Sequence, residues 1–219
     1  MEEVILKSAA LIEKETGPGR ILDVGCGYGF FLYHMAARGW QAEGIEISAQ
    51  GRHYAAEHFP RFRVRPKALP DPEIPDCSFD VVTLFYVLEH LADPVGVLRE
   101  VQRILKPDGL LLLRWPHSTP IVRLLGPLAR GLDLYHTPYH LFDYSTRFLE
   151  STLTGQGFTA IRTLLAGNTL PADRLGRWSS RIFGSLGEFL SRAGAGRLLL
   201  PGVSKTTLAR KKSPEWPFE

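Results

Sequence analysis

Apolar and polar residues form alternating blocks along most of this chain, and the spacing of apolar residues changes from block to block. Short continuous apolar runs rich in β-branched residues are typical of buried strands, whereas apolar residues three or four positions apart are typical of helices that cover a sheet. We expect strands at residues 20–24, 40–47, 62–65, 78–85, 109–115, 158–165 and 206–209. We expect helices at residues 2–15, 30–38, 49–58, 94–106, 121–130 and 146–154. Ser48, Asp93 and Ser145 are expected to be the N-caps of three of them.

This order of elements predicts an α/β fold, in which one mostly parallel sheet carries helices on both faces. A chain of 219 residues has the length of one ordinary domain. We therefore expect a single domain over residues 1–219, beginning with a leading helix at residues 1–16.

One long block, residues 168–200, departs from this alternation. Its apolar residues recur near helical spacing with arginines between them, which predicts a basic amphipathic helical insertion before the last strand. Such a helix can lie on a membrane surface, but it more often packs on its own protein or on a second subunit. We favour packing over membrane contact and expect a monomer or a homodimer.

Composition excludes several other classes of protein. A net charge of +3 is too small to argue for a nucleic-acid partner. The two cysteines, Cys26 and Cys77, form neither a disulfide framework nor a metal-binding spacing, and they fit a reducing cytoplasm. The chain has no apolar run long enough for a transmembrane helix, and its acidic start is unlike a signal peptide. We expect a cytoplasmic location.

A glycine-rich turn joins the first strand to the second helix. Gly25, Gly27 and Gly29 occupy alternate positions, and glycine allows both positive φ and the close approach of a ligand to the backbone. The helix that follows would present backbone N–H groups to a carboxylate or a phosphate. A dinucleotide fingerprint, G-x-G-x-x-G, is absent because Phe30 occupies its third glycine position.

The second strand ends in an acid, Glu46, which lies 19 residues beyond Gly27. In an open α/β sheet an acid at this distance lies beside the first turn and can bind ribose. One carboxylate can accept hydrogen bonds from both vicinal hydroxyls. Glu46 therefore predicts a nucleoside-binding site.

Two stretches together resemble a known family. The pattern Asp-x-Gly-x-Gly-x-Gly, from Asp23 to Gly29, resembles motif I of the class I S-adenosylmethionine (SAM)-dependent methyltransferases. The stretch FDVVTLFYVLEHLADP, residues 79–94, is similar to the branch that includes methyltransferases of the ubiquinone and biotin pathways. The resemblance implies a Rossmann-like seven-stranded sheet with an antiparallel last strand. It also implies a SAM-binding core at residues 20–115 and a substrate-side cap at residues 116–145.

The resemblance implies these SAM-binding candidates: Asp23, Gly25, Cys26, Gly27, Gly29, Phe30, Glu46, Ile47, Ala68, Leu69, Phe85, Tyr86 and His90. One position departs from the family, because Lys67 stands where relatives carry an acid that binds the adenine amino group. A lysine cannot accept that hydrogen bond. The backbone of Ala68 and Leu69, or the carboxylate of Asp71, is then left for this contact. Glu89 and His90 also admit a structural role, in which His90 hydrogen-bonds an adjacent loop.

The segment HTPYHLFDYS, residues 136–145, places His136 and His140 close together, and the resemblance implies that it lies over the substrate. Two explanations remain open for the histidines. An imidazole can accept a proton from a substrate hydroxyl, or the pair can tie the loop to its own backbone. No third ligand has convincing spacing, so we expect no metal site.

We therefore expect a SAM-dependent methyltransferase that acts on a small molecule, most simply on an oxygen nucleophile, and releases S-adenosylhomocysteine. No nucleic-acid partner is expected. The alternative is a SAM-binding protein without catalysis, regulatory or associated with a membrane through residues 168–200. Both alternatives require SAM binding, and only the first requires turnover.

Overall fold

The computed structural model describes residues 1–117, 139–165 and 204–213. The helices are α1 (Glu2–Glu15), α2 (Phe30–Ala36), α3 (Ala49–His58), the short 3-10 helix η1 (Leu88–His90), α4 (Pro94–Ile104) and α6 (Thr146–Gly155). The strands are β1 (Arg20–Val24), β2 (Gln41–Ile45), β3 (Arg63–Arg65), β4 (Phe79–Phe85), β5 (Leu105–Trp115), β6 (Phe158–Leu164) and β7 (Lys205–Lys211).

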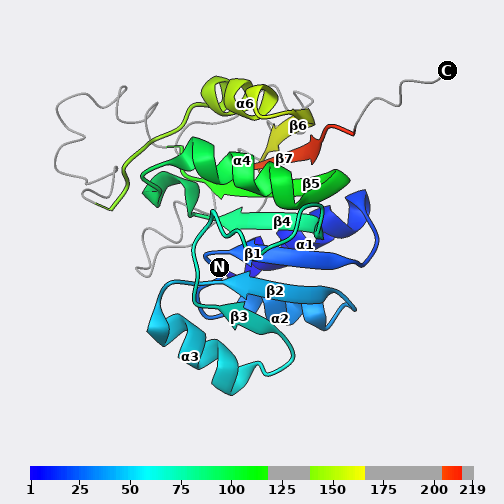
Figure 1. Cartoon of the computed structure of the whole chain (residues 1–219), viewed down its shortest axis with the longest axis vertical. Coiled ribbons are helices and arrows are strands. Elements are labelled where there is room, and N and C mark those ends of the chain that lie inside the picture. The colour runs from blue at the N-terminus through cyan, green and yellow to red at the C-terminus, as the bar shows by residue number, and fades with distance from the viewer. Residues whose placement is uncertain (118–138, 166–203, 214–219) are drawn as a thin grey trace.

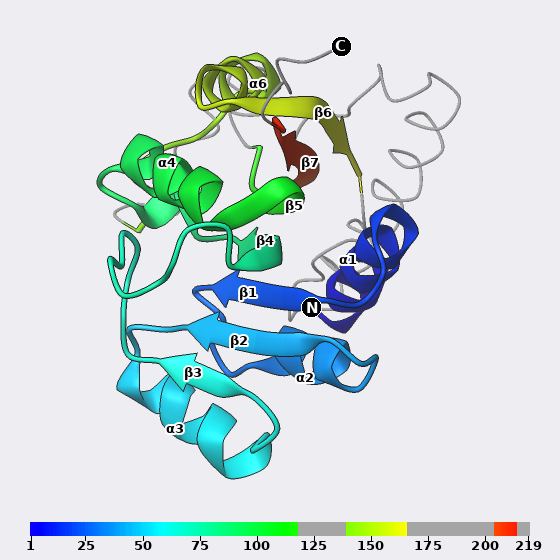
Figure 2. The same ribbon diagram turned by 45° about the vertical axis from the view of Figure 1, so that its right-hand side comes forward.

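All seven strands form one sheet in the order β3-β2-β1-β4-β5-β7-β6. The pairs from β3 to β5 are parallel, and β7 runs antiparallel to both β5 and β6. In Figure 2, α1 and α2 lie on one side of the sheet and α3, α4 and α6 on the other. The seven-stranded, mostly parallel sheet with an antiparallel last strand is therefore confirmed.

The central strands are buried on both faces, which explains their continuous apolar runs. Successive side chains of a strand point to opposite faces. Ile21 of β1 and Val81 of β4 accordingly pack with α1 and α2, whereas Leu22 and Val82 pack in the cluster that contains α4 and α6. The inner strands thus have little freedom to shift register, and their ends are held at defined heights along one edge of the sheet.

Three helix starts follow the expected capping chemistry, in which a side-chain oxygen accepts a backbone N–H of the first turn. Ser48 accepts from the N–H of Gly51 at the start of α3. Asp93 does the same for α4, and Ser145 for α6. These predictions are confirmed.

The prediction for the connection between α4 and β5 was wrong in its boundaries. We expected the helix to end before Pro107 and the strand to begin at Gly109, but β5 begins at Leu105. Leu105 already pairs with Phe79 of β4, because the backbone N–H of Ser78 donates to the carbonyl of Ile104 and draws this part of the chain against β4. The turn around Asp108, whose φ is 61°, therefore lies within the strand as an irregularity.

Several predicted features lie outside the described residues. They are the helix at residues 121–130, the insertion at residues 168–200, most of the cap at residues 116–145, and His136. Among the residues that are described, no helix has the length and apolar character needed to cross a membrane.

Candidate functional site

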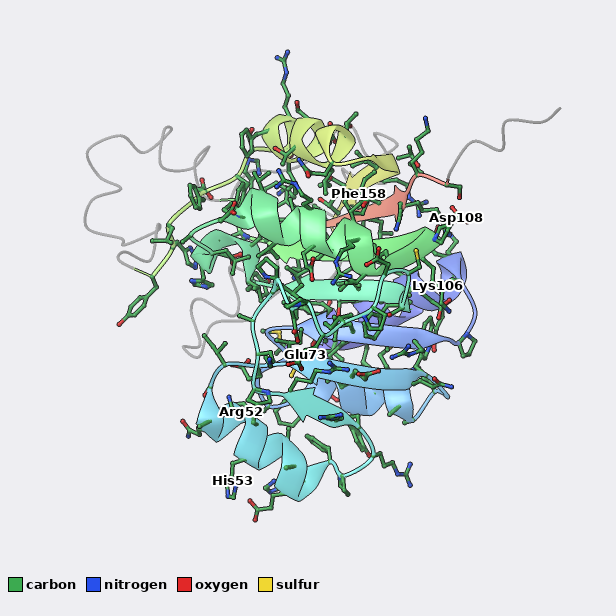
Figure 3. All side chains as sticks on the ribbon, viewed as in Figure 1. Arg52, His53, Glu73, Lys106, Asp108 and Phe158 are labelled. Atoms are coloured by element: carbon green, nitrogen blue, oxygen red, sulfur yellow. The ribbon has the colours of Figure 1, made fainter. Side chains whose placement is uncertain are left out.

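The candidate site lies at the edge of the sheet where the parallel strands end. β1, β2 and β4 lie side by side (Figure 1), and Val24 pairs with both Ile45 and Leu84, so the segments that follow these strands leave the sheet at one edge. Ligands of open α/β sheets bind outside this edge. Figure 3 shows both edges of the sheet. Arg52, just beyond β2, lies on the left and marks the edge where the parallel strands end, whereas Lys106 and Asp108, at the start of β5, lie on the right and mark the opposite edge.

The glycine turn after β1 is tightly tied to β2. The backbone N–H groups of Gly25 and Cys26 both donate to the carbonyl of Ile45, at 2.8 and 3.1 Å, and the N–H of Gly29 donates to the carbonyl of Cys26. The φ angles of Gly25, Gly27 and Gly29 are 71°, 54° and 81°, in the left-handed region that favours glycine. The three glycines thus have the conformational role expected from the sequence.

Gly25 and Gly27 face different surroundings. A Cβ atom built at Gly25 would lie 2.5 Å from Cγ2 of Val87, so this glycine lets the loop after β4 pack against the turn. A Cβ atom built at Gly27 would meet nothing within 4 Å. The outer surface of the turn is therefore open at Gly27.

Glu46 connects this turn to the segment after β2. Its Oε2 accepts the backbone N–H of Gly27 at 2.8 Å, and its Oε1 accepts the backbone N–H of Ser48 at 2.7 Å. A carboxylate has about four lone-pair positions, so each oxygen retains capacity for one more donor. The carboxylate is therefore held in place by the backbone and can still accept hydrogen bonds from a ligand.

Ile47 follows Glu46 and places an apolar surface beside it. The residue is 77% exposed although it is isoleucine. Its backbone is held by Arg52 of α3, whose guanidinium donates to the carbonyls of Ile47 at 2.7 Å and Glu46 at 2.9 Å. The backbone of this short segment is therefore held with its apolar side chain in solvent, which suits the face of a flat ring.

Asp23 lies behind the glycine turn and is buried. The hydroxyl of Thr83, on β4, donates to Oδ1 of Asp23 at 2.7 Å. Burial, with a contribution from the Glu46 carboxylate, raises the pKa of Asp23 to about 7. The sequence analysis missed Thr83, although a polar residue within the apolar run of β4 was a usable signal. Burial likewise raises the pKa of the Cys26 thiol above its usual range, so this cysteine stays a neutral thiol.

The pKa of Asp23 leads to an expected pH dependence of stability in the absence of ligand. Because the folded protein binds this proton more tightly than the unfolded chain, whose Asp pKa is about 3.9, stability should fall as the pH rises from about 4 to about 7. The contribution of one group is at most about 1.4 kcal/mol per pH unit. Urea unfolding of wild type and Asp23→Asn from about pH 5.5 to 7.5 measures it, and equal slopes for the two proteins would contradict it.

The candidates for the adenine contact, in the connection between β3 and β4, differ in their exposure to solvent. Lys67 pairs with Glu73 at 3.0 Å and points into solvent. Asp71 is buried, and its Oδ1 accepts the backbone N–H of Glu73. Ala68 is exposed and Leu69 is buried. Asp71 therefore serves the internal structure of this connection, and of these residues the backbone at Ala68 is the more accessible.

Phe30, Phe85 and Tyr86 differ in what their rings contact. The ring of Phe30 packs against Phe59, with ring centroids 5.6 Å apart, and so lies toward α3. The ring of Phe85 packs against Phe31 at 4.8 Å. The hydroxyl of Tyr86 accepts from Nε of Arg114 at 2.8 Å, and the φ of Tyr86 is 56°. Tyr86 thus marks a sharp turn at the end of β4.

The turn leads into η1, where the sequence analysis left two roles open for His90. Nδ1 of His90 lies 2.7 Å from the carbonyl oxygen of Tyr139, so the hydrogen bond to a loop, which was one of the roles left open, is present. The same contact brings His140 next to His90, with ring centroids 4.9 Å apart. Glu89, between Leu88 and His90, is buried, and burial raises its pKa to about 7.

The structure therefore brings Asp23, the glycine turn, Glu46 and Ile47 together. It places a second group, which consists of Glu89, His90 and His140, beside the end of β4 at the same edge. The second group is the part that the sequence did not predict. His90 and His140 are 50 residues apart, and no spacing rule connects them.

Comparisons with known proteins show the family to which the chain belongs. The family model described as a methyltransferase domain matches residues 2–163. A probable S-adenosylmethionine-dependent methyltransferase from Mycobacterium tuberculosis is 30% identical over 141 residues, which cover 64% of this chain and 49% of that protein. A ubiquinone biosynthesis O-methyltransferase from Ralstonia nicotianae is 30% identical over 150 residues, covering 64% of this chain and 61% of that protein. This chain spans about half the length of the first relative.

Solved structures show the same fold. A SAM-dependent methyltransferase from Archaeoglobus fulgidus is similar with a TM-score of 0.66 at 20% identity, over 96% of this chain and 94% of that protein. The YcgJ protein from Bacillus subtilis is similar with a TM-score of 0.69 at 18% identity, over 95% of this chain and 99% of that protein. The sheet is thus Rossmann-like, as expected.

Proposed function

The chain belongs to the family of SAM-dependent methyltransferases, whose cofactor is SAM, and on this premise we propose that it transfers the methyl group to an oxygen atom of a small-molecule acceptor. The observation that supports SAM binding most is the position of Glu46, and the choice of an oxygen acceptor is supported by the similarity to a ubiquinone biosynthesis O-methyltransferase. Its carboxylate is fixed by the backbone N–H groups of Gly27 and Ser48, at the place where the family binds the ribose.

The residues present fit the cofactor. Glu46 retains the acceptor capacity that two ribose hydroxyls need, and Ile47 offers an exposed apolar surface to the adenine ring. The open space at Gly27 allows the amino-acid end of SAM to approach the backbone. Ala68 and Leu69 would bind the adenine edge through backbone groups. These contacts would replace the carboxylate that relatives carry at the position of Lys67.

When bound, SAM supplies a methyl group made electrophilic by a positively charged sulfur. The main task of the protein is then to hold the acceptor in line with this methyl group, and such positioning contributes roughly 7–11 kcal/mol in favourable cases. The fixed backbone around Gly27 and Glu46 suits this task, because a cofactor held by rigid groups needs little further ordering.

The acceptor hydroxyl must also lose a proton. His140 is our candidate for accepting it, because the imidazole is half-buried beside His90 at the edge of the sheet where ligands bind. His136, which lies outside the described residues, remains a candidate from the sequence. A general base contributes about 10²–10⁴-fold to the rate.

Gly27→Ala tests the proposed SAM site without a large change in the fold. The methyl side chain would meet no protein atom within 4 Å, so the cost to stability is the left-handed conformation alone, about 1–2 kcal/mol. The same methyl group would occupy space proposed for SAM, and we expect SAM affinity to fall by about 1–3 kcal/mol, as for overpacking. Calorimetric titration with SAM measures the effect.

Gly39→Ala is the matched control for this experiment, since Gly39 also has a positive φ, 85°, and a Cβ there also meets nothing within 4 Å. Gly39 lies between α2 and β2, at the opposite edge of the sheet from the site. We expect it to leave SAM affinity unchanged. Equal SAM affinity in Gly27→Ala and wild type would contradict the proposed position of the cofactor.

The function itself is tested by incubating the protein with SAM and a panel of small molecules that carry phenol, alcohol, carboxylate or amine groups, and by measuring S-adenosylhomocysteine. We expect release with at least one hydroxyl-bearing acceptor. SAM binding without turnover on any panel member would favour the non-catalytic alternative, and turnover with amines alone would overturn the choice of oxygen.

A further inference from the structure

Three side chains that can bind metal ions meet beside the end of β4. Glu89 and His90 belong to η1, and His140 follows β5 in the chain. One carboxylate oxygen and one nitrogen from each imidazole all lie within 4.8 Å of one another. The rings of His90 and His140 are 4.9 Å apart and tilted by 70°.

Backbone hydrogen bonds hold the two parts of the chain in this arrangement. The N–H groups of Leu141 and Phe142 donate to the carbonyl of Glu89, at 2.8 and 3.3 Å. The hydroxyl of Tyr144 donates to the carbonyl of Leu88 at 3.0 Å. The segment that carries His140 is thus anchored to η1 on both of its sides, and the cluster is a product of the fold.

Glu89 is the most informative member of the cluster. The residue is 0% exposed, and among the residues that the structure describes neither of its carboxylate oxygens has a hydrogen-bond partner. A buried polar group left without a partner costs about 1–3 kcal/mol, and more when it is charged. Burial is the main factor that disfavours the charged carboxylate, and Asp143 adds to it, whereas the backbone N–H of Glu89 and the charge of a protonated His90 oppose it. A cation beside this carboxylate would remove the cost.

His90 is in a suitable state to bind a cation. Its Nδ1 lies 2.7 Å from the carbonyl oxygen of Tyr139, and because a carbonyl can only accept, Nδ1 must carry the proton. Nε2 of the neutral ring is then the nitrogen with a free lone pair. A hydrogen bond from the second ring nitrogen to a carbonyl is the usual way in which proteins orient a metal-binding histidine.

We propose that Glu89, His90 and His140 form a binding site for a divalent first-row transition-metal cation such as Zn²⁺. Two imidazoles and one carboxylate are a donor set for zinc and its neighbours, whereas Mg²⁺ and Ca²⁺ prefer oxygen ligands alone. Bond lengths of about 2.1 Å would bring the ligand atoms closer together than they are now, and rotation of the exposed His90 and half-buried His140 provides this adjustment.

The proposed role of the cation rests on the proposed function. Three protein ligands leave coordination positions open, as in catalytic zinc sites. Val87, two residues before Glu89, packs against Gly25 of the cofactor turn, so the cluster lies near the expected methyl donor. A hydroxyl oxygen on the cation loses its proton to water more readily. The deprotonated acceptor oxygen then forms the O–CH₃ bond as the S–CH₃ bond of SAM breaks and S-adenosylhomocysteine leaves.

The test measures metal binding by the full chain, without relying on activity. Protein stripped with a chelator is titrated with Co²⁺, whose visible absorption reports coordination, and with Zn²⁺ in a calorimeter. We expect one equivalent to bind to wild type, with affinity at least about tenfold lower in Glu89→Gln, His90→Ala and His140→Ala. The matched control is the exposed pair His53 and Glu57 on α3, where His53→Ala and Glu57→Gln should have no effect.

Each result decides the matter. Glu89 is buried and its variant can fail to fold, but the variants of His90 and His140 test the site independently, with circular dichroism and thermal unfolding as checks of folding. If wild type binds metal no more tightly than the His90 and His140 variants do, the proposed metal site is overturned. In that case SAM binding and turnover in the presence of a chelator would leave the methyltransferase function intact. Metal binding without SAM binding would support the metal site and overturn the proposed methyltransferase function.

Discussion

Replacing His140 by alanine is expected to lower kcat by about 10²–10⁴-fold, the usual contribution of a general base. The affinity for SAM should not change, because the contacts proposed for SAM lie at Gly27, Glu46 and Ile47. The loss is expected whether the imidazole accepts the proton itself or holds a cation that acidifies the hydroxyl. The measurement is kcat, KM for the acceptor and Kd for SAM, determined across pH.

His53→Ala is the control for this variant, because His53 is also a histidine but lies on α3, near the bottom of Figure 3, with an 85% exposed side chain. It should behave as wild type. If His140→Ala kept the kcat of wild type at every pH, His140 would have no part in proton removal, and His136 would become the leading candidate.

Replacing Glu46 by alanine is expected to raise the Kd for SAM strongly. Hydrogen bonds to a charged group contribute about 1.5–3 kcal/mol, which corresponds to about 10–150-fold in Kd. The effect should lie toward the upper end of this range, because the same change also releases the backbone N–H groups of Gly27 and Ser48. Titration calorimetry with SAM provides the measurement.

Glu46→Gln refines this test. The glutamine amide has one acceptor oxygen, so it can bind one of the two backbone N–H groups but not both, and we expect an affinity between those of wild type and Glu46→Ala. Glu57→Ala, an exposed change on α3, is the control. Unchanged SAM affinity in Glu46→Ala would rule out the ribose-binding role.

The local chemistry of several elements allowed them to be predicted from the sequence. Ser48, Asp93 and Ser145 were predicted as helix caps because each precedes a helical pattern, and the bonds are present. Between α4 and β5 the same reasoning failed, because a backbone bond from Ser78 extended the strand beyond the local turn signals. Pairing with a distant strand overrides such signals wherever it satisfies more backbone groups.

The sequence by itself determined the sheet, the glycine turn and the position of Glu46, because alternation, glycine spacing and the distance from turn to acid are all properties of neighbouring or regularly spaced residues. Only the tertiary structure decided that Thr83 binds Asp23, that the Glu46 carboxylate holds the turn, and that Glu89 and His90 meet His140. These contacts join residues up to 60 positions apart, and their meeting depends on strand order and on how loops leave the sheet. The burial that raises the pKa of Asp23 and Glu89 arises in the same way, since the exclusion of water is a property of the packed molecule.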